Sequence, residues 1–598
     1  MPISTKWAAT VVVAATVFAG GPDARAVESL LLFPISPADL PVGTTIFFKA
    51  APASADAHVF RFRVGTAGGA SSVVRDFAPR SYLDWTPMDD GAFDIEATAR
   101  NLVTGDITTA AITYTVSSRV TAGTPVVSPT RHPLVALYSA PPCETGLIRV
   151  RYSVNPGGRE QATPFKLCRP GRSVNFHVAG LYADTPYLLR HEIVAGDTTM
   201  GPTLTHRTPV VTAVMPPTLV LNPHDDPGGA VEGIVLHGTL ADDVRKTATF
   251  ATDLEGRALW YYDKSMFGWQ VGSHILRPLP GGNLLMSNGE NGVAWQMLRE
   301  MDIAGNSIRE TTVPRVNEQL AALGHDPVTA LHHDALRLPN GRMLVLGSVE
   351  RLLTGVQGPG TVNVLGDMLI ELDSEWQVTW AWNAFDHLDP RRAAVLRETC
   401  TGPLDGCRPL TLAPRANDWT HTNSIAYSPA DGNVLLSVRN QDWIVKVDYR
   451  DGTGTGAIVW RLGKDGDFSL AGNNDRLWFS HQHDVSVDSA NTLLLYDNGN
   501  ARCRLTPPPC QSRGQILQIN ELLRTATLRM NVGLGHYARV VGSAQRLANG
   551  NYHFGSGWVY PGPHSEALEV SPVGGVTYRL AAASITYRSW RMRDLYTP

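Results

Sequence analysis

The chain has 598 residues, with 51 Lys and Arg against 55 Asp and Glu, a formal net charge of −4, and 43% hydrophobic residues. A chain of this length is expected to hold more than one domain and to bury a large core. Because acids and bases nearly balance, the composition lacks the excess of positive charge that binds nucleic acid or an anionic membrane surface. We therefore expect neither partner.

The first 26 residues have the pattern of a secretory signal peptide. Lys6 gives a positive start, residues 8–19 are a short apolar run, and Ala24 to Ala26 fit a small-residue cleavage site. The apolar run is too short to span a bilayer, so a membrane anchor is the weaker alternative. We expect cleavage after Ala26 and a periplasmic or secreted protein without a membrane anchor.

Six cysteines fall into three pairs that are close in sequence. In an oxidising compartment an even number of cysteines favours disulfides, although the sequence alone does not fix the pairing. A metal site is less favoured because no CxxC pair occurs, so we expect no metal. The pairs are Cys143 with Cys168, Cys400 with Cys407, and Cys503 with Cys510.

Short β-rich runs separated by Gly, Pro, Asn and Asp dominate the chain, and helical periodicity is almost absent, which favours an all-β fold. Residues 27–122 read as one β-sandwich module and residues 123–215 as a second, with plausible strands such as 58–64 and 148–154. In their pattern of short strands and turns, both resemble immunoglobulin-like or fibronectin-like modules. One larger irregular sandwich is the alternative, so we expect one or two modules.

Residues 216–598 contain recurring hairpins of two kinds. In the first, an apolar strand, a Pro/Asn/Gly turn and a second apolar strand follow one another, as in 277–286 and 337–346. In the second, an acidic or polar turn leads into a strand that often carries Trp, as at 373–376. Interleaved hairpins of this kind predict a six-bladed β-propeller as the catalytic domain. The terminal run 585–590 is expected to close it by pairing with its beginning.

Histidines recur at the starts of the predicted strands. A propeller gathers the ends of its inner strands around one channel, so side chains far apart in sequence can converge there. A single histidine at such a place is as often structural, and we assign that role to His332 and His481. The four expected to share a site are His274, His333, His421 and His483.

Two arginines follow two of these histidines at the same spacing in the sequence. Arg351 lies eighteen residues after His333, and Arg439 lies eighteen residues after His421. Guanidinium groups match the edges of sulfate or phosphate and repel cations, which favours an oxyanion site over a metal site. Asn423 lies two residues after His421, on the same face of the strand that follows. The pattern predicts a site that handles a tetrahedral anion.

These residues lie in strings that resemble the bacterial arylsulfotransferases, exported enzymes that use no nucleotide sulfate donor. The resemblance covers roughly residues 230–590. The matching strings are His332-His-Asp with Leu338-Pro-Asn-Gly, Asp418-Trp-Thr-His-Thr-Asn-Ser, Ser437-Val-Arg-Asn-Gln, Trp460-Arg-Leu-Gly, Gln482-His-Asp with Leu495-Tyr-Asp-Asn-Gly, and Gly542-Ser-Ala-Gln-Arg-Leu-Ala-Asn-Gly-Asn.

The resemblance implies a role for each matching residue. His421 would be the nucleophile that forms a sulfohistidine, and a disulfide between Cys400 and Cys407 would precede it. The expected sulfuryl-binding residues are His274, His333 and Arg351, with Asn423, Arg439 and His483 as further substrate-binding residues and Trp419 and Tyr537 as candidates for packing the aromatic ring.

The expected reaction moves a sulfuryl group from an aryl sulfate donor to a phenolic acceptor by a ping-pong mechanism, without a cofactor. Fixed His and Arg donors would stabilise the sulfuryl oxygens in the transition state. Two alternatives stay open: a hydrolase in which water is the acceptor, and a non-catalytic propeller that only binds its ligand. The sequence also leaves open whether the protein is a monomer or a homodimer.

Overall fold

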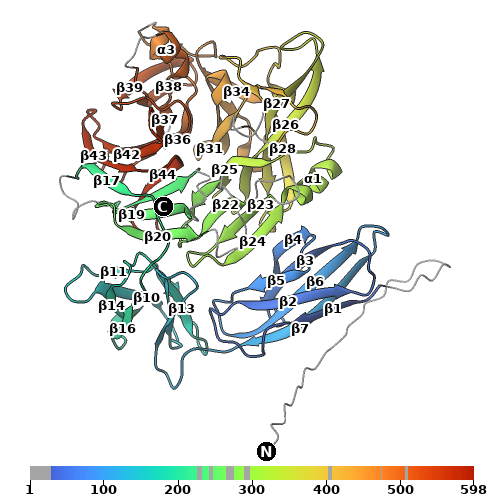
Figure 1. Ribbon diagram of the computed structural model, residues 1–598, viewed down its shortest axis with the longest axis vertical. Coiled ribbons are helices and arrows are strands. Elements are labelled where there is room, and N and C mark those ends of the chain that lie inside the picture. The colour runs from blue at the N-terminus through green and yellow to red at the C-terminus, as the bar shows by residue number, and fades with distance from the viewer. Residues whose placement is uncertain are drawn as a thin grey trace, which may run out of the picture.

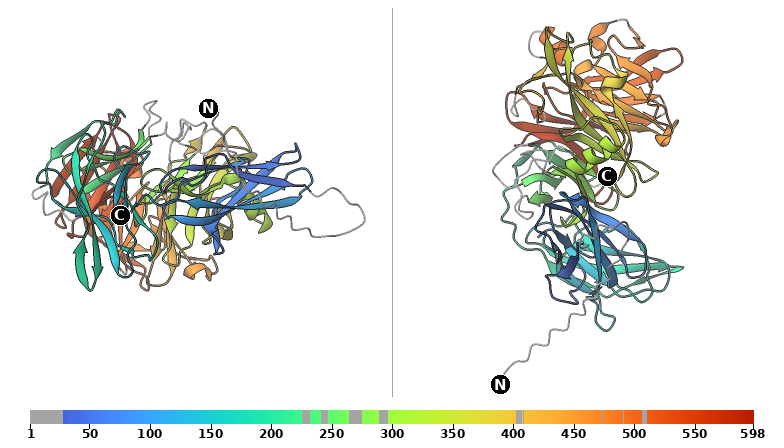
Figure 2. Two further views of the ribbon diagram at one scale, coloured as in Figure 1. Left: turned by 90° about the horizontal axis from the view of Figure 1, so that it is seen from below. Right: turned by 90° about the vertical axis from the view of Figure 1, so that its right-hand side faces the viewer.

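The computed structural model describes residues 28–224, 232–240, 247–263, 275–288, 296–401, 407, 409–472, 474–489, 491–505 and 510–598. The fold is mostly β, and the α-helices in these ranges are short: α1 (Val313–Ala322), α2 (Ala384–His387) and α3 (Asn500–Leu505). Figure 1 shows two small groups of strands side by side at one end and a larger body of sheets at the other. Figure 2 shows the same division from two further directions.

The first group is a sandwich of strands β1–β7. One sheet has the order β1-β2-β5, and the other contains β4-β3-β6-β7. Burial alternates along β3, so Phe60 and Phe62 face the core between the sheets. The strands are β1 (Leu30–Pro34), β2 (Ile46–Pro52), β3 (His58–Thr66), β4 (Ser71–Ala78), β5 (Tyr82–Trp85), β6 (Gly91–Asn101) and β7 (Ile107–Val116).

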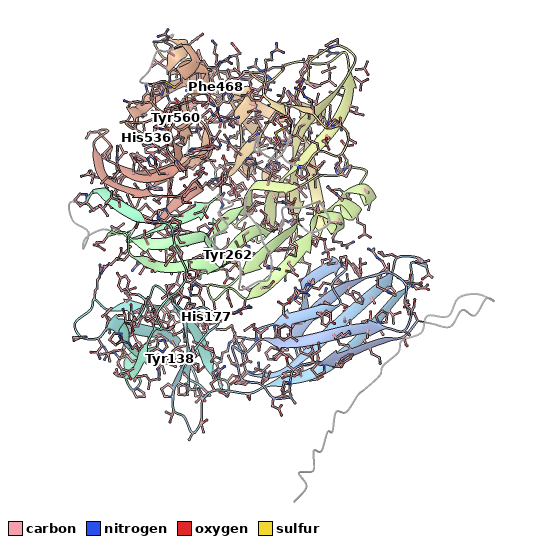
Figure 3. All side chains as sticks on the ribbon, viewed as in Figure 1. Tyr138, His177, Tyr262, Phe468, His536 and Tyr560 are labelled. Atoms are coloured by element: carbon pink, nitrogen blue, oxygen red, sulfur yellow. A yellow bond between two sulfur atoms is a disulfide. The ribbon has the colours of Figure 1, made fainter. Side chains whose placement is uncertain are left out.

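The second group contains strands β8–β16 around its own core. Cys143 and Cys168 form a disulfide there, and the buried Tyr138 hydroxyl lies 2.8 Å from His191 Nδ1. Figure 3 places Tyr138 and His177 in this group. The strands are β8 (Val126–Pro129), β9 (Ala136–Ala140), β10 (Leu147–Val154), β11 (Gln161–Ala162), β12 (Lys166–Leu167), β13 (Val174–Val178), β14 (Pro186–Ala195), β15 (Asp197–Met200) and β16 (Leu204–Arg207).

The large body is built from six antiparallel sheets. In chain order these are β18–β20 with β44, then β21–β24, β25–β28, β31–β34, β36–β39, and β40–β43 with β17. The bounds of the first three are β18 (Ile234–Thr239), β19 (Thr247–Asp253), β20 (Ala258–Asp263) and β44 (Thr586–Met592); β21 (Leu276–Pro278), β22 (Leu284–Asn288), β23 (Met297–Met301) and β24 (Ser307–Thr312); β25 (Leu331–Arg337), β26 (Met343–Thr354), β27 (Thr361–Leu372) and β28 (Val378–Asn383).

The remaining sheets continue this pattern, with short strands added at some edges. The bounds are β31 (Thr422–Ser428), β32 (Asn433–Val438), β33 (Trp443–Val447) and β34 (Ile458–Gly463); β36 (His483–Ser489), β37 (Thr492–Asp497), β38 (Arg513–Asn520) and β39 (Thr525–Gly533); β40 (Ser543–Arg546), β41 (Tyr552–Val559), β42 (His564–Val570), β43 (Val576–Ala582) and β17 (Thr218–Asn222); and the edge strands β29 (Thr399–Cys400), β30 (Ala416–Asp418) and β35 (Ser469–Leu470).

Neighbouring sheets meet through their first strands. Contacts run from β21 to β25, then to β31, β36, β40 and β44. Strand β44 also pairs with β18, from Ile234 opposite Met592 to Thr239 opposite Thr586. This confirms the expected pairing of the end of the chain with the beginning of the region. Residues buried on both faces of the middle strands, such as Leu344 and Val345 on β26, fill the space between sheets.

The first sandwich is attached to the sheet β21–β24 by a buried ion-pair network. Strands β4 and β24 form a parallel bridge between Arg75 and Glu310. The buried Arg75 guanidinium contacts Glu310 and lies 2.8 Å from Asp84, while Arg299 lies 2.6 Å from Glu310. Burial raises the pKa of Glu310, but the two guanidinium groups outweigh it and hold the pKa below its usual range. The carboxylate therefore stays charged at this junction.

Candidate functional site

A pocket of about 760 Å³ brings together five of the residues that the sequence singled out. It is bounded by the starts of β25 and β36, the residues just before β31, and the loop between β39 and β40. Most of its histidines lie near the start of a strand, where the backbone enters a sheet. The five residues are His333, His421, Arg439, His483 and Tyr537.

The first strands of successive sheets are joined by a repeated hydrogen bond, which defines equivalent positions. In each bond a backbone N–H donates to a side-chain oxygen of the preceding sheet: Ile425 N–H to Asp334 Oδ2 (2.9 Å), Val485 N–H to Ser424 Oγ (3.0 Å) and Ala544 N–H to Asp484 Oδ2 (3.0 Å). His333, Asn423 and His483 each precede the accepting residue, so these three are equivalent. His421 lies two residues before Asn423. This corrects the expectation that His421 shares the position of His333 and His483.

His421 is held by a carboxylate three residues before it. Its Nδ1 lies 2.6 Å from Asp418 Oδ2, and its backbone has φ of 49°, in the left-handed region. Burial raises the pKa of Asp418, but the neighbouring His421 outweighs it and lowers the pKa below its usual range. The charged carboxylate accepts the Nδ1 proton, so Nε2 carries the lone pair. The imidazole is thus fixed in the tautomer that a nucleophile requires.

His333 lies at the end of a chain of hydrogen-bonding groups. Its Nδ1 is 2.6 Å from His332 Nδ1, and His332 Nε2 is 3.1 Å from Asp367 Oδ1. Asp367 Oδ2 also accepts from the Thr420 hydroxyl and the Thr422 N–H, each at 2.6 Å. Burial raises the pKa of Asp367, but His332 and these bonds together lower it. The chain can stabilise an extra proton on the histidine pair, which makes His333 a candidate proton donor.

In contrast to His333, His483 is held as a neutral ring. Its Nδ1 lies 2.7 Å from Asn498 Oδ1, and the Asn498 amide donates to the carbonyls of Ala538 and Val541 at 2.8 and 2.9 Å. Because the amide group is fixed, Nδ1 must be the donor and Nε2 an acceptor. Burial and the charge of Arg439 lower the pKa of His483 well below its usual value. His483 therefore suits an acceptor role, not a donor role, near neutral pH.

The buried guanidinium at the pocket belongs to Arg439. It follows β32 and donates to Asn440 Oδ1 at 2.6 Å. Burial lowers its pKa, although Glu398 and Asp418 nearby favour the charged form. An Arg so placed, without an ion pair inside 4 Å among the described residues, is available to a substrate anion.

The structure does not bring Arg351 to this pocket. Its guanidinium lies 2.7 Å from Asp326 Oδ2 and 3.0 Å from Asp386 Oδ1, and it packs over the ring of Phe385 at 5.0 Å. The eighteen-residue offset from His333 fails as a guide because β26 and β27 continue past the level of the pocket as a long hairpin. Arg439 takes the place expected for Arg351.

Two further residues lie away from the cavity. Trp419 is 1% exposed, packs on Phe385 with ring centroids 5.0 Å apart, and donates its indole N–H to the Arg392 carbonyl at 2.8 Å. Asn423 is fully buried and donates its amide to the Gln482 carbonyl at 2.7 Å. Both are structural in this arrangement, which corrects the expectation that they bind substrate. His274 lies outside the described residues.

The sequence alone did not identify Tyr587 as part of the site. Its ring lies between two histidines, with centroids 5.4 Å from His333 and 6.4 Å from His483. The rings of His333 and His421 are 4.9 Å apart. Tyr587 donates its hydroxyl to the Asn423 carbonyl at 2.8 Å. The available signal was its position in the terminal strand, which completes the sheet begun by β18.

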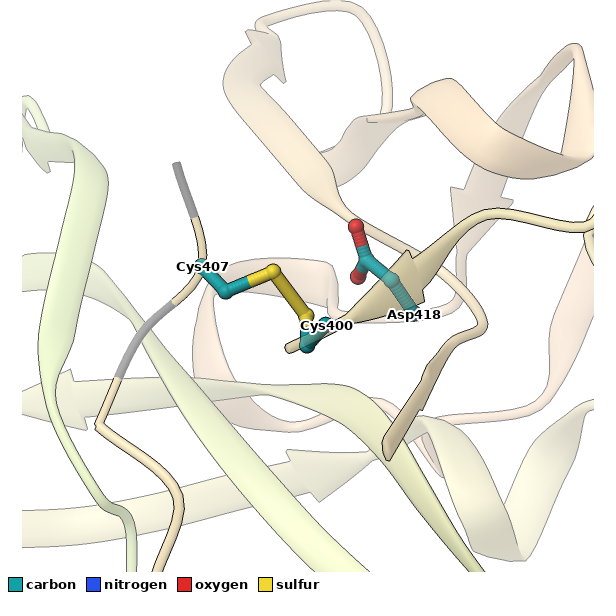
Figure 4. A group of neighbouring side chains, drawn as sticks. All are labelled: Cys400, Cys407 and Asp418. Carbon is teal, nitrogen blue, oxygen red and sulfur yellow. A yellow bond between two sulfur atoms is a disulfide. The ribbon is translucent and has the colours of Figure 1, made fainter. Parts of the chain in front are cut away.

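The disulfide between Cys400 and Cys407 forms the wall beside Asp418, as Figure 4 shows. The two sulfurs and a carboxylate oxygen of Asp418 lie within 4.8 Å of one another. Because the sulfurs are bonded to each other, they are not thiolate ligands for a metal. All three sequence-local cysteine pairs form disulfides, the third between Cys503 and Cys510. This confirms the expectation of three disulfides and gives the pairing that the sequence left open.

The assembled groups define a site for a group-transfer reaction on an anion. One imidazole offers a lone pair, a second can donate a proton, a third can accept one, and a buried guanidinium supplies positive charge. A model of the arylsulfotransferase (ASST) family matches residues 208–574. The chain therefore belongs to this family.

Two curated relatives carry the name arylsulfate sulfotransferase AssT. The protein from Escherichia coli is 26% identical over 310 residues, covering 42% of this chain and 47% of that protein. The protein from Lelliottia amnigena is 24% identical over 307 residues, with the same coverage of each. The match thus spans about half the length of these relatives.

Two solved structures show a weak resemblance to the chain. A two-domain fibronectin type III segment of chicken tenascin covers 30% of this chain and 97% of its own, at 15% identity and a TM-score of 0.14. A Salmonella alpha-2-macroglobulin mutant covers 93% of this chain and 29% of its own, at 9% identity and a TM-score of 0.12. Scores this low support no conclusion about the fold. No helix in the described ranges has the length and hydropathy to cross a membrane.

Proposed function

We propose that this protein transfers a sulfuryl group from an aryl sulfate ester to a phenol, with His421 as the nucleophile. The observation that carries the proposal is the contact of 2.6 Å between His421 Nδ1 and Asp418, which leaves Nε2 unprotonated beside His333 and Arg439. Family membership supplies the chemistry to which this geometry is suited. No nucleotide or metal has a role in the proposed steps.

We further propose that the six sheets form a closed propeller with the pocket at one end of its axis. Each sheet contacts the next through its first strand, and the last strand of the chain completes the first sheet. In such a ring, the starts of the first strands converge. This arrangement accounts for histidines from three different sheets lining one cavity.

In the first half-reaction, His421 Nε2 attacks sulfur, an N–S bond forms and the S–O(aryl) bond breaks. The leaving phenolate takes the proton that His333 holds, and the negative charge of Asp418 stabilises the imidazolium that results. Arg439 neutralises charge on the peripheral sulfuryl oxygens, which spreads in the transition state. The products are the free phenol and a sulfohistidine.

In the second half-reaction, a phenol occupies the space that the first one left. Its oxygen attacks sulfur while the N–S bond breaks and the His421 lone pair is restored. The phenol proton returns to the His333 chain, and the enzyme is regenerated. Since both rings use the same pocket in turn, the kinetics are expected to be ping-pong.

Incubation with 4-nitrophenyl sulfate tests the proposal directly. Without acceptor, mass spectrometry should find a sulfuryl group on the peptide that contains His421; with phenol added, phenyl sulfate should form as 4-nitrophenol is released. His421→Ala should abolish both, whereas His206→Ala, in the second sandwich, should not. Release of free sulfate without phenyl sulfate would identify a hydrolase, and absence of nitrophenol release would reject the enzyme assignment.

The three disulfides also support the proposal that the protein works in an oxidising compartment, periplasmic or extracellular. Measurement of activity in the periplasmic and cytoplasmic fractions of a Gram-negative expression host tests this proposal. Activity confined to the cytoplasmic fraction would reject it.

A further inference from the structure

The carboxylates of the pocket are already occupied by histidines. Asp418 binds His421, and Glu398 binds His481 Nε2, while His481 Nδ1 lies 2.9 Å from Asp442. Burial lowers the pKa of His481, but the two carboxylates outweigh it and raise the pKa above its usual value. Asp418 and Glu398 are therefore engaged by histidines, and the described residues show no ion pair between either acid and an arginine of the pocket.

Two arginines at the mouth of the pocket have no such partner. Arg504 is on α3 and Arg539 is in the loop between β39 and β40; both are exposed and both line the cavity. Neither makes an ion pair or a hydrogen bond with another described residue. Their neighbour Arg502 differs, because it lies 3.3 Å from Asp497 and donates to the Gln511 carbonyl at 2.8 Å.

The arginines of the mouth are separate from the buried cation of the site. Arg439 lies deep, near Asp418 and His483, and in the proposed mechanism it faces the sulfuryl oxygens. Arg539 and Arg439 both act on the hydroxyl of Tyr537, whose pKa burial raises and these cations lower in part. Tyr537 thus lies near both Arg439 and Arg539.

The walls between these two levels of charge are largely apolar. They include Leu396, Val540, Trp558 and Ile585. Such a lining suits an aromatic ring. An aryl sulfate whose sulfuryl group reaches His421 would therefore direct the far side of its ring toward Arg504 and Arg539.

We infer that the substrates of this site are phenols, and the corresponding sulfates, that carry a second anionic group such as a carboxylate on the far side of the ring. The inference rests on the proposed function and specifies its substrate class. Two guanidinium groups that have no ion-pair partner in the described part of the chain match a carboxylate in charge and geometry. Each such contact at an exposed rim is expected to change affinity by about fivefold or less.

The test compares 4-hydroxyphenylacetate with 4-hydroxyphenylacetamide as acceptors. The methylene group separates the charge from the phenol, so the two acceptors differ mainly in that charge. With 4-nitrophenyl sulfate as donor, we expect kcat/KM to be about tenfold higher for the acid. Arg504→Gln and Arg539→Gln should each reduce the rate with the acid about threefold and the rate with the amide less than twofold. Arg593→Gln, at an exposed arginine outside the pocket, is the matched control.

Calorimetric binding of both compounds to the unmodified protein separates this inference from the proposed function. Equal kcat/KM for acid and amide would overturn the inference while leaving sulfuryl transfer intact. Tighter binding of the acid, lost in the doubly substituted Arg504→Gln, Arg539→Gln protein, would support the inference even if neither compound were sulfated. Equal binding without turnover would reject both.

Discussion

Substitution of Asp418 by Asn tests the basis of the proposed nucleophile. The amide keeps the size of the carboxylate but loses its charge. Its NH2 group can donate to His421 Nδ1, and the imidazole then carries its proton on Nε2. A hydrogen bond to a charged group contributes about 1.5–3 kcal/mol, and about 1.4 kcal/mol corresponds to a factor of ten. Since the contact is 2.6 Å long and buried on the Asp418 side, we expect kcat/KM to fall roughly 10- to 150-fold.

The assay is initial-rate transfer from 4-nitrophenyl sulfate to phenol, with kcat and KM determined separately. A positioning role for Asp418 predicts that the loss falls on kcat and that less sulfohistidine forms in a single turnover. Asp448→Asn is the matched control, because Asp448 also accepts bonds from its neighbours but lies outside the pocket. If Asp418→Asn were folded and kept kcat/KM within twofold of the unmodified protein, the proposed fixing of the tautomer would be refuted.

Three further outcomes follow from the site. Arg439→Gln should lower kcat/KM about 100-fold, the usual effect of removing a transition-state donor, whereas Arg351→Gln should lower it less than fivefold. A larger loss in Arg351→Gln than in Arg439→Gln would show that Arg351 acts in the site. The pKa of His481 is raised on folding, so the protonated histidine stabilises the folded protein fully below its ordinary pKa of about 6.5, and this stabilisation is lost as pH rises through the raised value. The free energy of unfolding in urea should therefore differ less between pH 6 and pH 9 in His481→Gln than in the unmodified protein. An equal difference in both proteins would contradict this. Replacing both Cys400 and Cys407 by Ser should destabilise the protein by about 2.5 kcal/mol and lower the rate of sulfuryl transfer. Thermal unfolding measures the first effect and initial-rate kinetics the second. If stability and rate were both unchanged, the disulfide would not support the wall beside Asp418.

The sequence predicted the β-rich fold and, among the residues around the cavity, His333, His421, Arg439, His483 and Tyr537. Periodic turns and alternating apolar residues are local properties, so strands such as β3 were recognisable from their pattern. The histidines of the pocket were recognisable because each begins a strand. What failed was counting along the chain: Arg351 lies on a hairpin that extends past the pocket, and a fixed offset cannot register that extra length.

The supporting groups could not be predicted because they depend on contacts between distant segments. Asp367, on β27, reaches His332 on β25 across the intervening strand β26, and Tyr587 reaches the site only because β44 pairs with β18. Trp419 and Asn423 lie two residues to either side of His421, where regular alternation would place all three side chains on one face. The left-handed backbone of His421 interrupts that alternation, and the side chains of Trp419 and Asn423 lie in the core. Proximity in sequence to His421 was therefore a poor guide to proximity to its reactive nitrogen.

The pairing of β44 with β18 has a consequence for the order of folding. Tyr587 and the buried Arg588, which binds Asp334 and the Asn423 carbonyl, lie on a strand that is far along the chain from its partner β18. Pairing of strands so distant in sequence closes a long loop, which costs conformational entropy and is slow compared with the formation of a local hairpin. The sheet β18–β20 is therefore expected to gain its last strand, and the pocket to gain Tyr587, after the neighbouring hairpins have formed.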